Sequence, residues 1–199
     1  MRVLARLRSP RAIQDFLDGL DYSNFEAARS PRGVLRDRRA QCFDGAVLAA
    51  AALQRLGYPP LLFDLEAERD DDHVLALYKV GGLWGAVGMS NTTTLRFREP
   101  VHRTLRELAL SYFEFYFNLA REKTLRRYSS PLKLARFERA HWRTDDAAMP
   151  RIESALYALR HYELAPARAL RALSRIDKRA FDAGLLGARR EGLYRAPRG

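Results

Sequence analysis

An almost wholly apolar stretch in the first third of the chain constrains the fold most. Residues 46–53 are only alanine, valine and leucine, and they sit inside a longer segment, 42–56, that has helical character. Gly57 is a typical C-cap, and the two prolines that follow it prevent the helix from continuing. A helix that is apolar on nearly every face must be buried. The sequence therefore predicts that 42–56 is the central helix of a domain.

The chain then changes character twice. After the central helix come three strand patterns, at 61–68, 73–80 and 83–90. Further helical patterns occur at 10–20, 104–120, 129–137, 149–164 and 166–186. This order predicts an α+β fold in which an antiparallel sheet packs on the central helix. We expect a core over residues 1–128 and a helical C-terminal extension, 129–199, packed on that core.

The register of the predicted hairpin bears on the site. Gly81 and Gly82 mark the turn between its two strands. A two-residue turn places Ser90 opposite His73, whereas a three-residue loop places Asn91 opposite His73. A slip of one residue turns every side chain to the other face, so both registers stay open.

Composition narrows the cellular setting. The chain has 199 residues, 47% of them hydrophobic, and a single cysteine, which excludes an intramolecular disulfide. A lone thiol favours a reducing compartment, so we expect a cytoplasmic protein. No apolar run is long enough to span a bilayer. The arginine-rich first 20 residues lack a continuous apolar core and are interpreted as structure, not as a signal peptide.

The net charge of +11 is distributed broadly, not gathered into one site. Residues 42–100 carry 5 basic and 8 acidic side chains, and residues 101–199 carry 21 basic and 11 acidic ones. Only 4 of the 35 basic residues are lysine. This pattern favours a solvated arginine-rich surface, so we expect neither a nucleic-acid partner nor a membrane partner. The oligomeric state is left open.

Cys42 is the main candidate for chemistry. It begins the central helix, where outward N–H groups and the helix dipole favour an anion and lower the pKa of a thiol. His73 opens a strand that should pack nearby, and an imidazole can take the proton of a thiol. Other interpretations are a buried packing cysteine and a satisfied polar histidine. Candidates for a third, orienting group are Asn91, Ser90, Asp71 and Asp72, although the run 70–72 is most simply a solvated turn.

A metal or cofactor is not expected. His73, His102, His141 and His161 are scattered without the spacing of a metal site.

The segments AQCFDGAVLAAAALQRLGYPPLL and DDDHVLALYKVGGLWGAV resemble the transglutaminase-like superfamily of papain-like cysteine enzymes. The segments LRFREPVHRTLRELALSYFEFYFN and KTLRRYS are similar to those of a bacterial transglutaminase-like group of unclear function. The resemblance implies a papain-like core and a Cys-His-Asp triad acting on amide or thioester bonds. It places the nucleophile at Cys42 and the base at His73. Gln41, Ser90 and Trp84 are assigned to oxyanion binding or support of the site.

The acid of that triad is missing. Gly88 stands near the position where the superfamily commonly has an aspartate, and we predict that Asn91 orients His73 instead. The expected function is a cysteine acyl-transfer enzyme, of peptidase, amidase or protein-glutamine acyltransferase type, with a peptide or protein amide as substrate. The alternative is a non-catalytic binding or scaffold protein. For the enzyme we predict a depressed pKa at Cys42.

Overall fold

The computed structural model describes residues 3–23 and 27–194 of the chain. The predicted central helix is confirmed as α3, Cys42–Arg55, and every residue from Phe43 to Leu53 is buried. Gly57 follows the helix with φ of +92°, a left-handed conformation that suits glycine. The helix ends where the sequence indicates because Pro59 and Pro60 cannot extend it.

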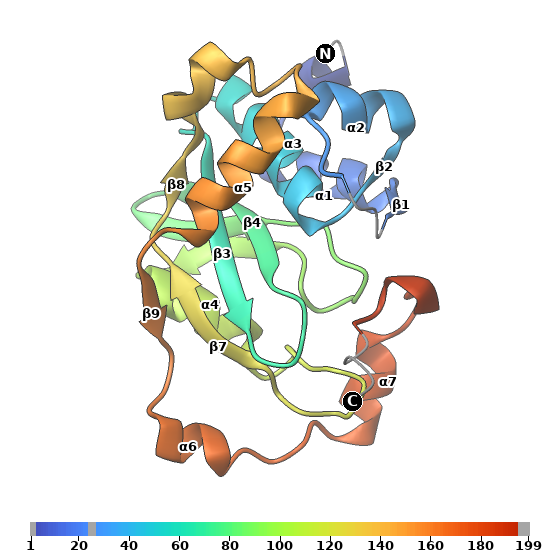
Figure 1. Cartoon of the computed structure of the whole chain (residues 1–199), viewed down its shortest axis with the longest axis vertical. Helices are drawn as coiled ribbons and strands as arrows, with labels where there is room; N and C mark the ends of the chain where they lie inside the picture. Colours follow the sequence, from blue (N-terminus) through green and yellow to red (C-terminus); the bar gives the residue numbers. More distant parts are fainter. Residues whose placement is uncertain (1–2, 24–26, 195–199) are drawn as a thin grey trace.

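In the described residues a seven-stranded antiparallel sheet stands beside this helix (Figure 1). Its main path runs in the order β6, β5, β4, β3, β7 and β9, and β8 pairs with β3. The strands are β3 Leu61–Ala67, β4 His73–Val80, β5 Leu83–Val87, β6 Arg98–His102, β7 Leu125–Ser129, β8 Leu132–Lys133 and β9 His161–Glu163. The expected α+β class with an antiparallel sheet on a central helix is therefore present.

Successive side chains along a strand point to opposite faces of the sheet, so the sheet has a hydrophobic core on each face. Leu62 and Val74 face α3, while Phe63 and Leu75 face helix α4, Leu105–Phe113. The sheet is thus covered on both faces, and the candidate site lies at the start of β4.

The hairpin between β4 and β5 has the two-residue turn. Gly81 and Gly82 both have positive φ, as a type I′ turn requires, and Val80 pairs with Leu83. The last pair of this ladder joins Ala76 to Val87. Residues after Val87 leave the sheet, so neither Ser90 nor Asn91 pairs with β4.

The N-terminal helices cover the outer side of α3. They are η1 Val3–Arg6, α1 Pro10–Asp18 and α2 Pro31–Asp37, and a small parallel pair joins β1 Asp21–Tyr22 to β2 Arg39–Ala40. We expected a loop and short turn at 29–41. Helix α2 forms there because the Ser30 side chain accepts a bond from the N–H of Gly33 and Pro31 suits the first helical turn.

The C-terminal third is less helical than the sequence pattern predicts. Its helices are short: η2 Leu134–Ala140, η3 Asp146–Ala148, α5 Met149–Tyr157, α6 Ala167–Arg171, α7 Lys178–Gly184 and η4 Arg190–Gly192. Strands β8 and β9 also join the sheet, and the expected boundary after residue 128 falls inside β7. Residues 129–194 therefore belong partly to the same sheet as the core. The buried Trp142, from this region, packs in the α3 core.

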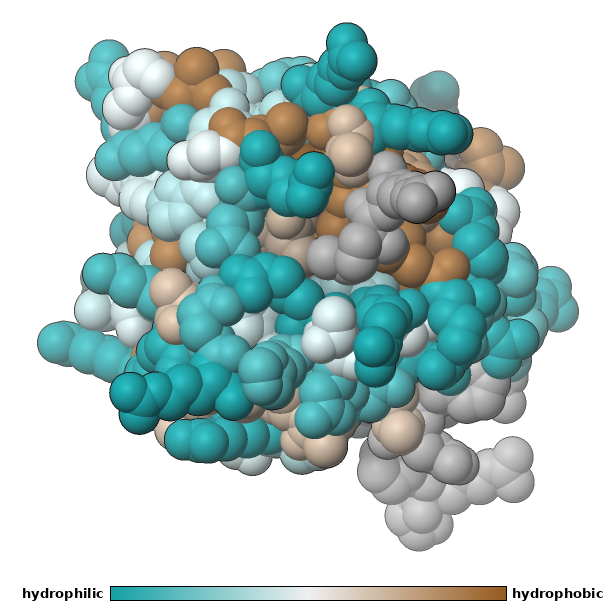
Figure 2. Space-filling model, turned by 90° about the horizontal axis from the view of Figure 1, so that it is seen from above, coloured by the Kyte–Doolittle hydropathy of each residue, from teal (hydrophilic) through white to brown (hydrophobic). Residues whose placement is uncertain are grey.

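The end of the molecule that carries the N-terminal helices is mostly hydrophilic, with a hydrophobic strip among the polar side chains (Figure 2). Within residues 3–23 and 27–194, no helix is both long and apolar enough to cross a membrane.

Candidate functional site

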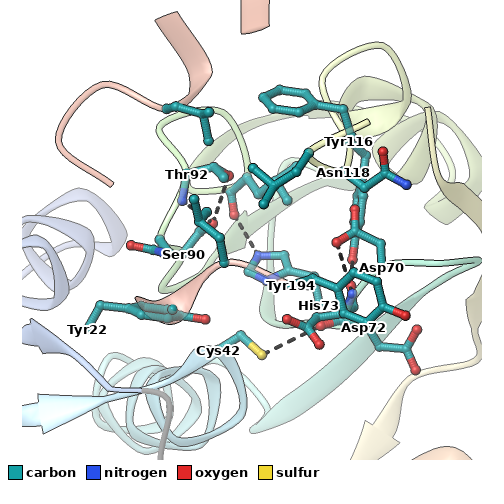
Figure 3. Close-up of a pocket in the computed structure, with 18 residues that line it drawn as sticks. Tyr22, Cys42, Asp70, Asp72, His73, Ser90, Thr92, Tyr116, Asn118 and Tyr194 are labelled. Carbon is teal, nitrogen blue, oxygen red and sulfur yellow. Dashed lines mark hydrogen bonds between the residues drawn. The ribbon is translucent and has the colours of Figure 1, made fainter. Parts of the chain in front are cut away.

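A small pocket lies where the start of α3 meets the start of β4 (Figure 3). It encloses about 70 Å³, room for a few waters or one small side chain. It is lined by Tyr22, Cys42, residues 70–73, 90–92, Leu95, 116–119, Leu185 and residues 192–194. Cys42 and His73, the two residues expected to carry the chemistry, thus line one cavity.

Cys42 is the first residue of α3 and is partly buried. Its thiol lies 3.7 Å from the carbonyl oxygen of Asp72, a distance at which the S–H donates a weak hydrogen bond. Burial raises the pKa of the Cys42 thiol to about 12, and the negative charges of Asp44 and Asp64 act in the same direction. The backbone N–H of Val74 opposes this effect on the pKa but is outweighed. The predicted depressed pKa is therefore wrong, because burial and acidic neighbours exceed the effect of the helix start.

His73 is 4% exposed, and its Nε2 lies 2.6 Å from the carbonyl oxygen of Leu95. A carbonyl oxygen can only accept, so Nε2 carries the proton and Nδ1 of the neutral ring keeps its lone pair. Burial lowers the pKa of His73 to about 4, although the Leu95 hydrogen bond partly offsets this. The imidazole is therefore neutral near pH 7 and has one basic nitrogen.

The thiol and the imidazole form a neutral pair, not an ion pair. Among the described residues no hydrogen bond joins the sulfur of Cys42 to the ring of His73; the thiol instead contacts the Asp72 carbonyl. The expected direct contact between nucleophile and base is thus absent from this conformation, although both line the same pocket.

Asn91 does not orient His73. Its side-chain N–H donates to the carbonyl oxygen of Arg189 at 2.8 Å, and its carbonyl oxygen accepts from the N–H of Arg189, also at 2.8 Å. The prediction that Asn91 takes the third catalytic place is wrong in this structure. The reason is local: the β4–β5 ladder stops at Val87, so Asn91 sits in a loop and faces the C-terminal segment.

The structure explains why no aspartate stands at position 88 beside His73. A Cβ placed on Gly88 would lie 3.4 Å from Nε2 of His73, so Gly88 does stand beside the imidazole. The same Cβ would collide with the Leu75 side chain, which leaves no room for an aspartate there. The Leu95 carbonyl supplies the acceptor instead. Sequence reasoning missed it because every residue has a backbone carbonyl, and nothing in the side chains marks this one.

The three assigned supporting residues have different surroundings. Ser90 lines the pocket, but its hydroxyl accepts from the N–H of Thr92 at 3.1 Å and so closes a turn. Gln41 precedes α3 without a side-chain capping bond and does not line the pocket. Trp84 pairs with Lys79 near the hairpin turn, six residues along β4 from His73, or roughly 20 Å. Gln41 and Trp84 are therefore not placed to support this pocket.

Acidic residues before β4 line the pocket as well. The Asp70 carboxylate accepts from Thr124 Oγ1 at 2.7 Å, and Asp72 accepts from the N–H of Ala67 at 2.8 Å. Burial raises the pKa of Asp70 to about 7 and also raises the pKa of Asp72. Only Asp71 is exposed, so the expected solvated turn is wrong for its two neighbours.

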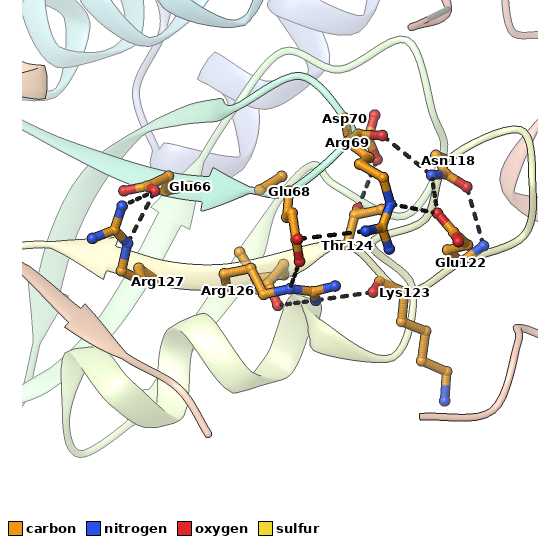
Figure 4. A network of polar contacts seen from close by, with 12 residues as sticks. Glu66, Glu68, Arg69, Asp70, Asn118, Glu122, Lys123, Thr124, Arg126 and Arg127 are labelled. Atoms are coloured by element: carbon orange, nitrogen blue, oxygen red, sulfur yellow. Dashed lines mark hydrogen bonds and ion pairs between the residues drawn. The ribbon is translucent and has the colours of Figure 1, made fainter. Parts of the chain in front are cut away.

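A polar network holds this acidic loop in place (Figure 4). Arg69 adopts a left-handed φ of 59°, and its Nε donates to Glu122 at 3.0 Å. Asn118 donates to the carbonyl of Arg69 at 3.1 Å, while Arg126 pairs with Glu68 at 2.7 Å. These contacts join the loop to the turn before β7, so the acidic wall of the pocket is pre-organised.

Within the described residues there is no cluster of three or more His, Cys, Asp or Glu side chains that could hold a metal ion. No family model matches the chain, and no curated protein matches it either. Any assignment of function therefore rests on the residues and on the geometry of the pocket.

Proposed function

We propose that the pocket is a cysteine acyl-transfer site of transglutaminase-like type, with Cys42 as nucleophile and His73 as general base. One observation carries the proposal: the thiol at the start of a buried helix and an imidazole locked as its Nε2–H tautomer line the same small pocket. Such a pair can split acyl transfer into two easier steps. The substrate class is a peptide or protein amide.

The chemistry follows from the tautomer. Nδ1 of His73 takes the thiol proton while the Cys42 sulfur attacks the acyl carbon, so that an S–C bond forms and the substrate carbonyl becomes an oxyanion. Backbone N–H groups of the first turn of α3 are suited to hold that oxyanion. The ring then gives its proton to the leaving amine as the C–N bond breaks. A water or an amine then attacks the thioester carbon while Nδ1 of His73 takes its proton, and the ring returns that proton to the sulfur as the S–C bond breaks and Cys42 is released. Rotation of the Cys42 side chain away from the Asp72 carbonyl precedes the first step, while the Leu95 carbonyl holds the His73 ring in place.

A neutral pair predicts a particular pH dependence. Because the pKa of His73 is lowered to about 4, the base is available throughout the neutral range. Because the pKa of Cys42 is raised to about 12, the thiol keeps its proton over the same range, so the reactive neutral pair is fully populated and the rate is flat with pH across the neutral range. A preformed thiolate–imidazolium pair differs in another way: its sulfur would react with an alkylating reagent at mildly acidic pH, where the neutral thiol of Cys42 reacts slowly.

A second candidate is a binding protein without turnover. Two observations favour it: the thiol contacts the Asp72 carbonyl, and Asn91 is engaged with Arg189 and not with His73. In that case the pocket holds a ligand while Cys42 remains a packing residue.

Reaction with an activated ester distinguishes the acyl-transfer enzyme from the binding protein. The protein is incubated with p-nitrophenyl acetate at pH 8, and the intact mass shows whether one acetyl group is added. The proposal predicts a single acetyl group on Cys42, absent in Cys42→Ser and slowed in His73→Ala by about 10² to 10⁴-fold. His102→Ala is the matched control, since His102 lies on β6 outside the pocket. Acetylation that is equal in wild type and His73→Ala would leave the binding protein as the better account.

A further inference from the structure

The C-terminal segment of the chain crosses the candidate site. After α7 the chain returns to the loops at the end of the sheet, where Gly192, Leu193 and Tyr194 line the pocket together with Cys42 and His73 (Figures 1 and 3). We refer to residues 185–194 as the C-terminal strap. Its presence there has to be explained by contacts, because no residue of the strap is buried.

The principal contact is made by the Asn91 amide to the main chain of Arg189. One bond runs from Nδ2 to the Arg189 carbonyl and the other from the Arg189 N–H to Oδ1, both at 2.8 Å. Arg189 has φ of −80° and ψ of 120°, an extended conformation. Neither bond depends on which side chain position 189 carries. Asn91 therefore recognises an extended peptide main chain.

The strap covers the side-chain amide of Asn91 closely. Asn91 is 9% exposed with the strap in place, and both polar groups of its amide are paired with the strap main chain. Gly192 also passes close to it, since a Cβ there would lie 3.0 Å from Nδ2 of Asn91 and 3.1 Å from the Tyr22 ring. The groove thus fits a main chain closely at two points.

Charge selects the side chains that the groove accepts. Asp70, Asp71 and Asp72 line the pocket, and no lysine or arginine does so within the described residues. The strap brings Arg189, whose side chain pairs with Asp21, and the exposed Arg190. A neutral or basic peptide is therefore compatible with the groove, whereas an acidic one is repelled.

We infer that Asn91 is the main-chain clamp of a peptide-binding groove leading to Cys42, and that the strap occupies this groove in competition with a neutral or basic peptide. The role of that peptide as substrate rests on the proposed function; its binding does not. The strap is readily displaced, because its residues are all at least partly exposed and its ion pair to Asp21 is at the surface.

Alkylation of Cys42 by iodoacetamide measures whether the strap covers the thiol. The full-length protein, Asn91→Ala and Arg189→Pro are compared at pH 9, with far-UV circular dichroism to check folding. Proline suits the φ of Arg189 but lacks the N–H that Asn91 accepts from. Both variants should be alkylated about tenfold faster than wild type, the equivalent of losing one well-formed hydrogen bond. Arg190→Ala, in the same segment, should match wild type. If Asn91→Ala does not fold, Arg189→Pro alone decides.

Peptide binding is then tested in trans. A synthetic peptide of residues 185–194, LLGARREGLY, should protect Cys42 of Arg189→Pro from alkylation. The same peptide with an N-methyl group on its first arginine, the counterpart of Arg189, should not protect. Unchanged alkylation in Arg189→Pro, or equal protection by the two peptides, would overturn the inference. These readouts require no turnover, so peptide protection without acetylation of Cys42 would uphold the groove and refute only the proposed enzyme.

Discussion

Two histidines of the sheet, His73 and His161, have partners of different chemical kinds. His73, at the start of β4, is bonded through Nε2 to the backbone carbonyl of Leu95 at 2.6 Å. His161, at the start of β9, is bonded through Nε2 to the carboxylate of Asp64 at 3.0 Å. The carboxylate–histidine pair that thiol enzymes commonly use is thus present on β3 and β9, whereas the imidazole in the thiol pocket has a neutral partner.

The two hydrogen-bond partners have different effects on the charge at each site. A carbonyl fixes the tautomer of His73 but adds no charge, so burial decides and lowers the pKa of the ring. At the other site burial raises the pKa of the Asp64 carboxyl, while the hydrogen bond from His161 acts against it. The charged form of the Asp64 carboxyl is therefore supported by a hydrogen bond from its neighbour, whereas charge at His73 is avoided.

The largest expected effect comes from breaking the hydrogen-bonded pair of Asp64 and His161. His161→Ala leaves the Asp64 carboxylate buried without its main partner and should lower the free energy of unfolding by about 3 to 5 kcal/mol at pH 8. At pH 5 the cost should shrink, because Asp64, whose pKa is raised by burial, can be protonated. Urea denaturation at the two pH values measures both. A loss below about 1 kcal/mol at pH 8 would mean that Asp64 is solvated and that the contrast between the two histidines is smaller than the structure indicates.

Removing the neutral histidine should cost less. His73→Ala leaves the Leu95 carbonyl without its donor, and we expect a loss of about 1 to 3 kcal/mol at pH 7. The sign of the pH dependence is opposite to that of a histidine whose pKa is raised by an ion pair. Since the pKa of His73 is lowered to about 4 by burial, the unfolded chain binds a proton first and the wild type loses stability as pH falls from about 6.5 towards 4. The variant lacks that loss, so the gap between the two proteins should narrow in acid. A gap that widens would show that His73 is charged in the fold.

The smallest expected change in the free energy of unfolding comes from substituting Asp70, in the acidic wall of the pocket. Burial raises the pKa of Asp70 to about 7, so the folded chain holds this proton more tightly than the unfolded chain, and stability contributed by the neutral form is lost as pH rises from about 4 through 7. Asp70→Asn should therefore be the more stable protein at pH 8, by on the order of 1 kcal/mol, and should show little advantage at pH 5. Urea midpoints at the two pH values provide the check, and Asp71→Asn, at the exposed neighbour, is the matched control.

The sequence and the structure agree best where local signals are strong. The helix from Cys42 is predicted because an alanine- and leucine-rich run must be buried, and the hairpin because two glycines suit a tight turn. The site depends on long-range contacts that leave no such signal. The Leu95 carbonyl is 22 residues from His73, and Arg189 is 98 residues from Asn91.

The C-terminal third illustrates the same limit. Strand β9, His161–Glu163, has only three residues, and no alternation can be read from so short a segment. It was predicted as the end of a helix because the preceding residues have helical spacing. Pairing with β7 overrides that local preference, since Tyr128 and Tyr162 face each other and their rings stack at 5.4 Å.

The protonation state of His73 tests the central claim most directly. Long-range ¹H–¹⁵N spectra of the histidine rings, recorded between pH 5 and 8 and assigned with His73→Ala, report both the charge and the tautomer. The account predicts a neutral His73 with its proton on Nε2 throughout this range, because burial lowers its pKa to about 4 and the Leu95 carbonyl holds the proton. An imidazolium at pH 7 would contradict the neutral pair and point to a thiolate at Cys42. A neutral ring with its proton on Nδ1 would remove the basic nitrogen that the proposed chemistry requires.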